Sequence, residues 1–191
     1  MNIDMSEFSD FEQPILAGSM AGRKIFSALV TLEYPKEHSE VCFFDFSQTD
    51  LMTQSCFRDS LLAFRDYCRV SLQNVYPVIQ NANDLTLEEV NDYLVSQRDA
   101  FPACDLDGEG RVTWSGVLGV LDEKQIIALD RIANKKGELT ASQLRREADG
   151  VGTTAWNNRL SALAAKGILM ESQKGRAKVY KTVLEGLSVG R

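Results

Sequence analysis

The sequence predicts an α/β domain followed by a smaller α+β unit, and three observations support this fold class. Apolar runs typical of buried strands alternate with helical patterns between residues 14 and 120. Three helical patterns and a two-stranded hairpin pattern follow between residues 121 and 184. The charge also changes sign: residues 1–120 hold 8 Lys and Arg against 19 Asp and Glu, a net of −11, whereas residues 121–191 hold 13 against 8, a net of +5.

Length and composition are those of an ordinary globular protein. The chain has 191 residues, 44% hydrophobic and 25% charged, which is enough for two small domains. No apolar run approaches the roughly 18 residues that span a bilayer, and the acidic N-terminus lacks the pattern of a secretory signal. We therefore expect a cytoplasmic protein without membrane association. Residues 1–13 are expected to be an acidic, disordered N-terminus, and residues 185–191 a flexible tail.

Residues that usually carry catalysis or bind metals are sparse. Cys42, Cys56, Cys68 and Cys104 have neither metal-ligand nor disulfide-framework spacing, so we expect them in the core. His38 is the only histidine, which excludes sites that need two imidazoles. No Ser, His and Asp or Cys and His combination suggests a catalytic site. The sequence therefore predicts a protein that is not an enzyme and has neither a cofactor nor a metal.

The first half of the N-terminal domain is predicted from apolar patterns and helix-capping residues. Residues 14–19 indicate a short strand, and Ser19 is expected to cap a helix that Pro35 ends. Residues 41–46 form a continuous apolar run, typical of a strand buried on both faces. A helix is expected over residues 55–68, where apolar residues recur at helical spacing.

The second half of that domain continues the alternation. Residues 75–81 predict another buried strand. Thr86 and Glu89 have the spacing of a capping box, which predicts a helix over residues 85–100. A hairpin over residues 103–116 closes the domain. Strands that alternate with helices indicate a largely parallel sheet with helices packed on it.

Part of this domain resembles the STAS-like family, which includes the anti-sigma-factor antagonists. The resemblance rests on Asp45-Phe46-Ser47 at the end of a buried strand and on residues 53–57 at the start of a helix, and it covers about residues 14–120. In antagonists a serine at this helix start is phosphorylated by a partner kinase, and Ser55 is at the matching position. Residues 53–56 differ from the antagonists' Asp-Ser-Ser-Gly. Two alternatives stay open for Ser55: a phosphorylation site, or a helix cap.

The C-terminal unit is predicted to begin with three helices. The first covers residues 121–137, with acidic residues in its first turn and basic residues in its last. The second covers residues 141–148 after an N-cap at Thr140, and the third follows a cap at Thr153 or Thr154. Four residues of the first helix are expected on one apolar face: Ile126, Ile127, Leu129 and Ile132.

The third helix and the residues after it carry the most specific pattern in the chain. Trp156, Leu160 and Leu163 recur at helical spacing and predict one buried face. A two-stranded hairpin is expected over residues 168–181. Three helices followed by a hairpin, over about residues 121–184, resemble the winged helix-turn-helix domain of bacterial transcription regulators.

This second resemblance implies duplex DNA as the partner. In such domains the third helix enters the major groove and reads bases, while neighbouring elements contact phosphates. The residues expected to read bases are Thr153, Thr154, Asn157, Asn158 and Ser161. The residues expected to contact phosphates are Arg145, Arg146, Lys174, Arg176 and Lys178.

Together these patterns predict a DNA-binding transcriptional regulator. Its STAS-like domain is expected to supply dimerisation, partner binding or signal input, and a homodimer is expected to read two-fold DNA sites. The linker near residues 119–122 is short, so we expect the two domains to pack rigidly. One alternative is a non-enzymatic adaptor whose winged helix contacts protein. Another is a small-molecule sensor that uses the STAS-like domain as its pocket.

Overall fold

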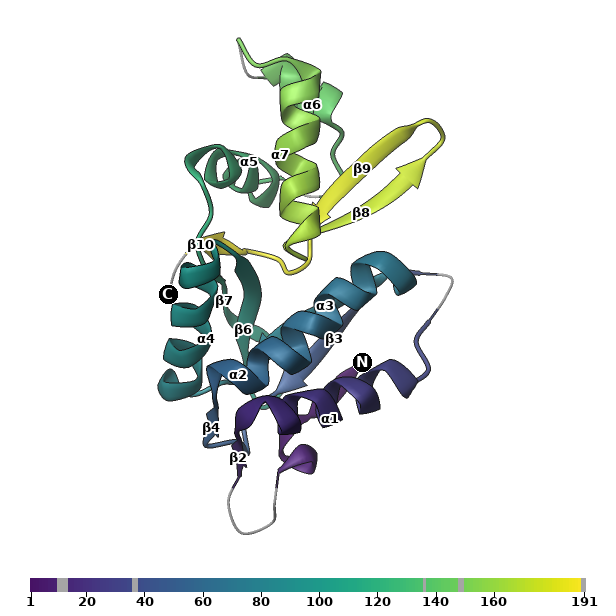
Figure 1. The fold of residues 1–191 in the computed structure, drawn as a ribbon. Coiled ribbons are helices and arrows are strands. Elements are labelled where there is room, and N and C mark those ends of the chain that lie inside the picture. The colour runs from purple at the N-terminus through teal and green to yellow at the C-terminus, as the bar shows by residue number, and fades with distance from the viewer. Residues whose placement is uncertain (10–13, 36–37, 136, 148–149, 190–191) are drawn as a thin grey trace.

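The computed structural model has a mixed α/β fold with a largely parallel central sheet (Figure 1). It describes residues 1–9, 14–35, 38–135, 137–147 and 150–189. In spatial order the sheet contains β1 (Asn2–Asp4), β3 (Glu40–Asp45), β5 (Val75–Gln80), β6 (Ala100–Leu106), β7 (Val112–Gly119) and β10 (Ser188–Val189). Neighbouring strands run parallel except β6 and β7, which form the antiparallel hairpin that the sequence predicts.

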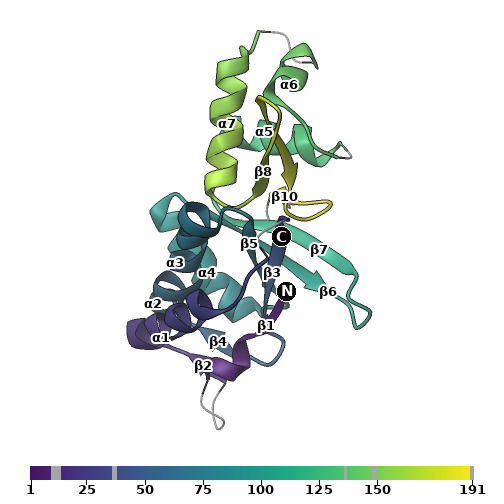
Figure 2. The same cartoon turned by 90° about the vertical axis from the view of Figure 1, so that its right-hand side faces the viewer.

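Helices from the first half of the chain cover one face of this sheet (Figure 2). They are α1 (Gly18–Thr31), α2 (Gln54–Phe57), α3 (Ala63–Tyr67) and α4 (Asp84–Gln97), with π-helical segments at Arg58–Leu62 and Cys68–Leu72. Beside them β2 (Ile15–Leu16) pairs with β4 (Leu51–Met52), and a 3-10 helix (Met5–Phe8) follows β1. No helix in the described ranges is long and apolar enough to cross a membrane.

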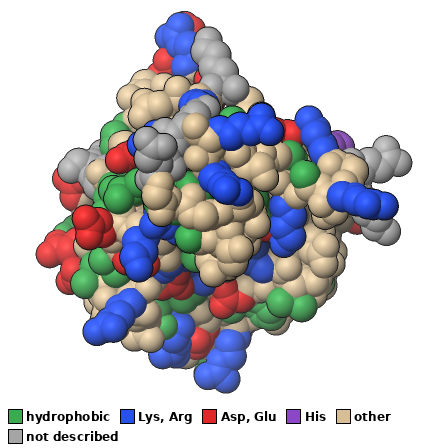
Figure 3. Space-filling model, turned by 90° about the horizontal axis from the view of Figure 1, so that it is seen from above, with side chains coloured by type: hydrophobic (Ala, Val, Ile, Leu, Met, Phe, Trp, Pro, Cys, Tyr) green, Lys and Arg blue, Asp and Glu red, His purple; other side chains and the backbone are tan. Residues whose placement is uncertain are grey.

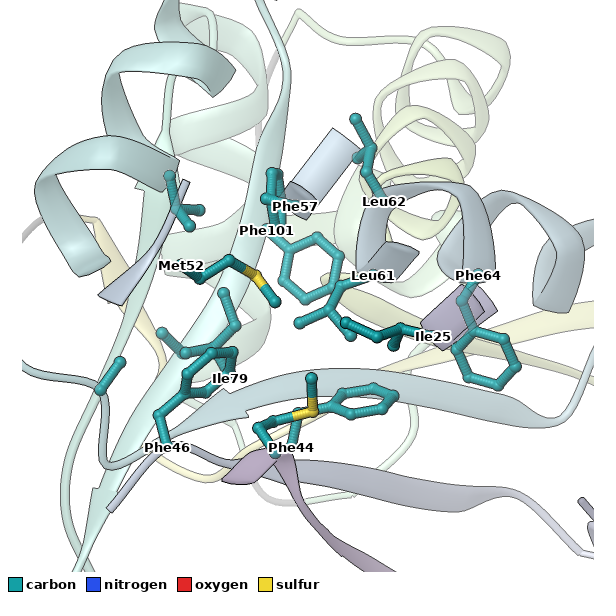
Figure 4. Packing of buried hydrophobic residues seen from close by; sticks show 14 of the residues in the cluster. Ile25, Phe44, Phe46, Met52, Phe57, Leu61, Leu62, Phe64, Ile79 and Phe101 are labelled. Carbon is teal, nitrogen blue, oxygen red and sulfur yellow. The ribbon is translucent and has the colours of Figure 1, made fainter. Parts of the chain in front are cut away.

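Aromatic side chains fill the space between these helices and the sheet (Figure 4). Phe44 of β3 meets Phe64 of α3 edge-on, with ring centroids 5.9 Å apart. Phe57 of α2 meets Phe101 of β6 in the same way at 5.5 Å. Edge-on pairs are a favoured arrangement of aromatic rings and add to the free energy of burying them. This core accounts for the apolar patterns that predict the strand near residue 41 and the helix near residue 55.

The opposite face of the sheet packs against the C-terminal elements. Side chains alternate along β5: Val75 and Ile79 belong to the core beneath the N-terminal helices, whereas Tyr76 and Val78 belong to a second core. Because both faces of β5 are covered, this strand is apolar along almost its whole length.

Three helices and a hairpin form the C-terminal elements (Figures 1 and 2). They are α5 (Glu123–Ala133), α6 (Ala141–Glu147) and α7 (Thr153–Ala165), followed by the antiparallel strands β8 (Leu169–Lys174) and β9 (Ala177–Thr182). The chain then returns to the sheet, where β10 lies parallel to β7. Leu129 and Leu187 share the second core with Tyr76 of the sheet. The predicted boundary between residues 120 and 121 therefore lies within one continuous core.

A polar cluster reinforces the junction between the sheet and α7. Arg65 is almost fully buried, and its Nη2 lies 2.9 Å from Asp99 Oδ2. Lys166, at the end of α7, places its Nζ 3.1 Å from the other carboxylate oxygen. Burial acts to raise the pKa of Asp99, but the hydrogen bond and charge of Arg65, with help from the Ala100 N–H and Lys166, hold that pKa below its usual value.

The predictions of disorder at the two ends are wrong for most of the residues concerned. β1 pairs with β3, and Met5 is fully buried; residues 10–13 lie outside the described ranges. Near the other end β10 joins the sheet and Leu187 is buried. The polar composition of both ends predicted disorder, but single apolar side chains there, Met5 and Leu187, are buried in the cores of the protein.

Three predicted helix caps also differ from the structure. Ser19 is inside α1, and Ala17 is the N-cap residue. Thr86 is inside α4: the cap is Asn83, whose Oδ1 accepts from the Thr86 N–H at 2.9 Å. Asn is at least as good a cap as Thr, and three residues separate the two candidates.

The third difference concerns α7, which begins at Thr153, so that Gly152 is the N-cap rather than Thr153 or Thr154. The N-cap predicted at Thr140 is confirmed, because its Oγ1 accepts from the Gln143 N–H at 3.2 Å. On α5 the predicted apolar face is one residue too wide, since Ile127 is 41% exposed.

Candidate nucleic-acid interface

Helix α7 buries one face and presents the other to solvent. Trp156, Leu160 and Leu163 are buried, which confirms the spacing argument. Among the described residues no side chain caps the N-terminus of α7, where the N-cap residue is Gly152, so the first backbone N–H groups could bind an anion. Of the residues predicted to read bases, Thr154, Asn157 and Asn158 are exposed, whereas Thr153 and Ser161 are half-buried.

A groove of about 470 Å³ runs between α6, the N-terminal half of α7 and β9. It brings together residues from both predicted sets, namely Thr153, Asn157, Ser161, Arg176 and Lys178. The remaining lining is small or polar and comes from the start of α6 and from β9: Thr140, Ala141, Ser142, Ala177 and Tyr180. The groove therefore places hydroxyl and amide groups opposite two cationic side chains.

Tyr180 fixes the hairpin against α7, a role that the sequence analysis missed. Its hydroxyl lies 3.2 Å from Ser161 Oγ, and burial is the largest cause that raises its pKa. Its backbone exchanges two hydrogen bonds of 2.8 Å with Leu139, the residue before the α6 cap. The Ser161 hydroxyl is therefore engaged inside the protein. Alternation along residues 177–181 gives no signal for a buried Tyr180, because it places Tyr180 on the same face of the strand as Lys178.

Helix α6 contributes two arginines: Arg145 contacts a residue that lines the groove, and Arg146 points to solvent. Arg145 Nη1 lies 3.5 Å from Thr153 Oγ1, which links the second helix of this unit to the start of the third. Arg146 is exposed and does not line the groove. Asn158 and Thr154 also lie outside the lining, on the surface of the first turns of α7.

Two of the predicted phosphate-binding lysines are ion-paired. Lys174 Nζ lies 2.6 Å from Glu138 Oε2, and Lys178 Nζ lies 2.6 Å from Glu171 Oε1. The hydrogen bond to Glu171 raises the pKa of Lys178, so this side chain stays charged. Arg176 is exposed in the hairpin turn and pairs with none of the described carboxylates. Figure 3 looks down on this end of the molecule, where Lys and Arg side chains are spread among fewer Asp and Glu.

Ser55 does not occupy the N-cap position of α2. It lies inside α2, half-buried, and Thr53 occupies the N-cap position, so the prediction that Ser55 caps the helix is wrong. The carboxylate of Glu89 accepts from the Gln54 N–H at 3.3 Å. A phosphate on Ser55 would therefore face an existing negative charge at this helix start. Nothing in these contacts favours the phosphorylation alternative.

The four cysteines are buried and free, as their spacing predicts. Burial raises the pKa of Cys42, Cys68 and Cys104 to about 12 and that of Cys56 to about 11. Their thiols are therefore protonated at neutral pH and poor nucleophiles.

Comparison with known proteins assigns no family: no family model matches the chain, and no curated protein matches its sequence. A proposal about function therefore depends on the groove and on its two cationic side chains, Arg176 and Lys178. The sequence predicted the helices and the hairpin that carry these residues. It did not show which of them meet in one groove, because that depends on how β9 packs against α6 and α7.

Proposed function

We propose that this chain is a DNA-binding transcriptional regulator whose residues 121–184 act as a winged helix-turn-helix. One observation carries the proposal: the groove between α7 and β9 gathers amide and hydroxyl groups on one wall and Arg176 and Lys178 on the other. Base-edge readers next to phosphate-binding cations are what a duplex requires of a protein surface.

In this proposal α7 enters the major groove by its N-terminal half. The amides of Asn157 and Asn158 are exposed on that half, and an Asn amide is able to pair with both adenine N6 and N7. The uncapped N-terminus of α7 and Arg176 would contact phosphates on either side. The net charge of +5 over residues 121–191 attracts the DNA polyanion. The net charge of −11 over residues 1–120 repels it, so DNA would approach the C-terminal elements.

The N-terminal part is proposed as a STAS-like domain for dimerisation, partner binding or signal input. Support comes from the shared core: Tyr76 of the sheet packs in the same cluster as α5 and α7 residues. Its hydroxyl also accepts from the Glu171 N–H of β8 at 3.1 Å. A shift of Tyr76 in the sheet would therefore move β8 of the hairpin through this hydrogen bond.

Charge reversal in the groove tests this proposal. Arg176→Glu combined with Lys178→Glu is expected to weaken binding of duplex DNA at least about tenfold at moderate salt, since two phosphate contacts become repulsive. Fluorescence anisotropy with a labelled duplex measures the affinity, and thermal unfolding checks the fold. Arg23→Glu is the matched control, because Arg23 is an exposed cation on α1, far along the chain from the groove. Equal affinities for the groove variant and the wild type would show that the hairpin does not contact DNA.

One observation favours a second candidate, a protein-interaction adaptor. The solvent face of α7 carries few cations: Arg159 stacks on the Trp156 ring at 5.0 Å, and Lys174 and Lys178 of the hairpin are ion-paired. A protein partner would be compatible with such a mixed polar surface. The two candidates separate in one experiment, because an adaptor would bind duplex DNA weakly, without sequence preference, and lose it as salt rises.

A further inference from the structure

Two glutamates form ion pairs with Lys174 and Lys178 of the hairpin. Glu138, between α5 and α6, reaches Lys174 near the hairpin tip, and Glu171 of β8 reaches Lys178 of β9, each at 2.6 Å. Both lysines are more than half exposed, with side-chain exposures of 70% and 52%. The carboxylates are less exposed than their partners, at 27% and 30%. Lys174 and Lys178 therefore lie along the protein surface, each directed toward a carboxylate that is less exposed than the lysine itself.

The lysine ends of these pairs are exposed to water, although Glu138 Oε2 itself is buried. Exposed ion pairs add little net stability, because water screens the charges and long side chains lose freedom when they pair. The hairpin is instead positioned by buried groups, above all Tyr180 and Val179, which are at most 5% exposed. The two glutamates are therefore free to serve another purpose than stability.

We propose that Glu138 and Glu171 are built-in competitors for phosphate, which keep Lys174 and Lys178 neutralised until the correct duplex is bound. The inference rests on the proposed DNA-binding function and extends it to the regulation of the same surface. Each lysine contributes to binding only after it leaves its carboxylate. Sequence-blind attraction to DNA is reduced, and the affinity depends more on the base contacts of α7.

The competition sets the salt dependence of binding. On B-DNA each phosphate neutralised by a free cation adds about 0.9 to the steepness of log K against log salt. A lysine that must first release a carboxylate adds less, because the freed carboxylate takes up a counterion. Glu138→Gln and Glu171→Gln are each expected to tighten binding to random-sequence duplex severalfold near 0.1 M salt and to steepen that slope by up to about 0.9. Glu185→Gln is the matched control, since Glu185 is exposed and pairs with none of the described Lys and Arg side chains.

A double-mutant cycle separates the ion pair from general electrostatics. Lys174→Gln is expected to change the affinity of the wild type for random-sequence duplex little, because that lysine is already neutralised by Glu138. In the Glu138→Gln background the same substitution is expected to remove the gain. If the cost of Lys174→Gln is the same in both backgrounds, the carboxylate acts only through its bulk charge and the inference is overturned.

The outcomes distinguish this inference from the function on which it rests. Wild-type binding with an unchanged slope in both glutamine variants overturns the inference and leaves the DNA-binding proposal standing. No binding of duplex by the wild type or by the folded double variant Glu138→Gln with Glu171→Gln overturns the proposed function itself. Binding that appears only in the double variant supports both. Thermal unfolding of each variant confirms that the fold is kept.

Discussion

Gly119 shows how tightly one residue constrains the exit from β7. Its φ is +85°, and a Cβ at this position would lie 2.2 Å from the Asp99 carbonyl oxygen and 2.7 Å from Leu94 Cβ. Both the left-handed backbone and the close approach of β6 require glycine here. The chain passes this point shortly before α5, which begins at Glu123 after its N-cap Asp122.

Gly119→Ala is therefore expected to destabilise the protein by about 3 kcal/mol or more, because backbone strain and overlap add. Gly137→Ala is the matched control: its φ is +93°, but no atom lies within 4 Å of the added Cβ. The control is expected to cost only about 1 kcal/mol. Urea unfolding measures both, and equal losses would contradict the steric argument.

Asp99 makes stability depend on pH at the junction with α7. Its pKa is lower in the folded state than in the unfolded chain, so the carboxylate stabilises the fold above the unfolded value of about 3.9. That contribution is lost as the pH falls through the lower, folded pKa. Asp99→Asn is expected to cost about 2 kcal/mol near pH 7, because Arg65 is buried and loses a charged partner.

The difference between wild type and Asp99→Asn is expected to shrink as the pH is lowered below about 4. Unfolding curves at several pH values measure it. Asp66→Asn is the control: Asp66 also pairs with Arg65, at 2.7 Å, but its side chain is 63% exposed. A gap between wild type and Asp99→Asn that stays constant with pH would contradict the assignment.

At the level of elements, periodic patterns in the sequence predicted helices and strands correctly, but they did not predict which side chains of different elements meet. The buried stripe of α7 and the strand at β5 follow from helical and apolar patterns, which depend on local sequence alone. The ion pair of Lys174 with Glu138 joins residues 36 positions apart and depends on how the hairpin folds back. The same holds for Thr86, whose Oγ1 accepts from the Met52 N–H of β4 at 3.2 Å, a contact that places Thr86 inside the helix.

β10, like β1, is a strand that the sequence did not predict, and Leu187 is the buried residue that precedes it. Leu187 is 1% exposed in the second core, whereas Val189 on the strand itself is 43% exposed. Leu187→Ala is expected to cost about 3 kcal/mol, and Val189→Ala well under 1 kcal/mol. Thermal or urea unfolding of the two variants checks this. Similar small losses would mean that the return of the chain to the sheet is not structural.

At the scale of the whole molecule, the mixed α/β fold was predictable from the sequence, but the contacts between its two predicted parts were not. Alternating strand and helix patterns led to a largely parallel sheet with packed helices, as observed. The second core joins Tyr76 and Ala100 of the sheet to Leu129 and Leu160 of the helices, so the two predicted domains are packed as one body. Composition and charge change near residue 120, but buried contacts continue across it, and only the three-dimensional packing reveals them.

This rigid packing bears on the proposed function. A signal received by the sheet would reach the hairpin and α7 without a flexible linker, through Tyr76 and the cluster of Asp99 with Lys166. The groove between α7 and β9 is the place where such a signal would alter binding. We propose that this groove binds duplex DNA and reads its sequence.

Selection of bound duplexes from a random-sequence pool, at low and at moderate salt, tests that claim most directly. We expect one shared sequence to be enriched at moderate salt, with loss of enrichment when Asn157 and Asn158 are both replaced by Ala. A shared palindrome would in addition indicate a dimer. Recovery of unrelated sequences at low salt and of none at moderate salt would contradict the claim and favour a protein partner for the same groove.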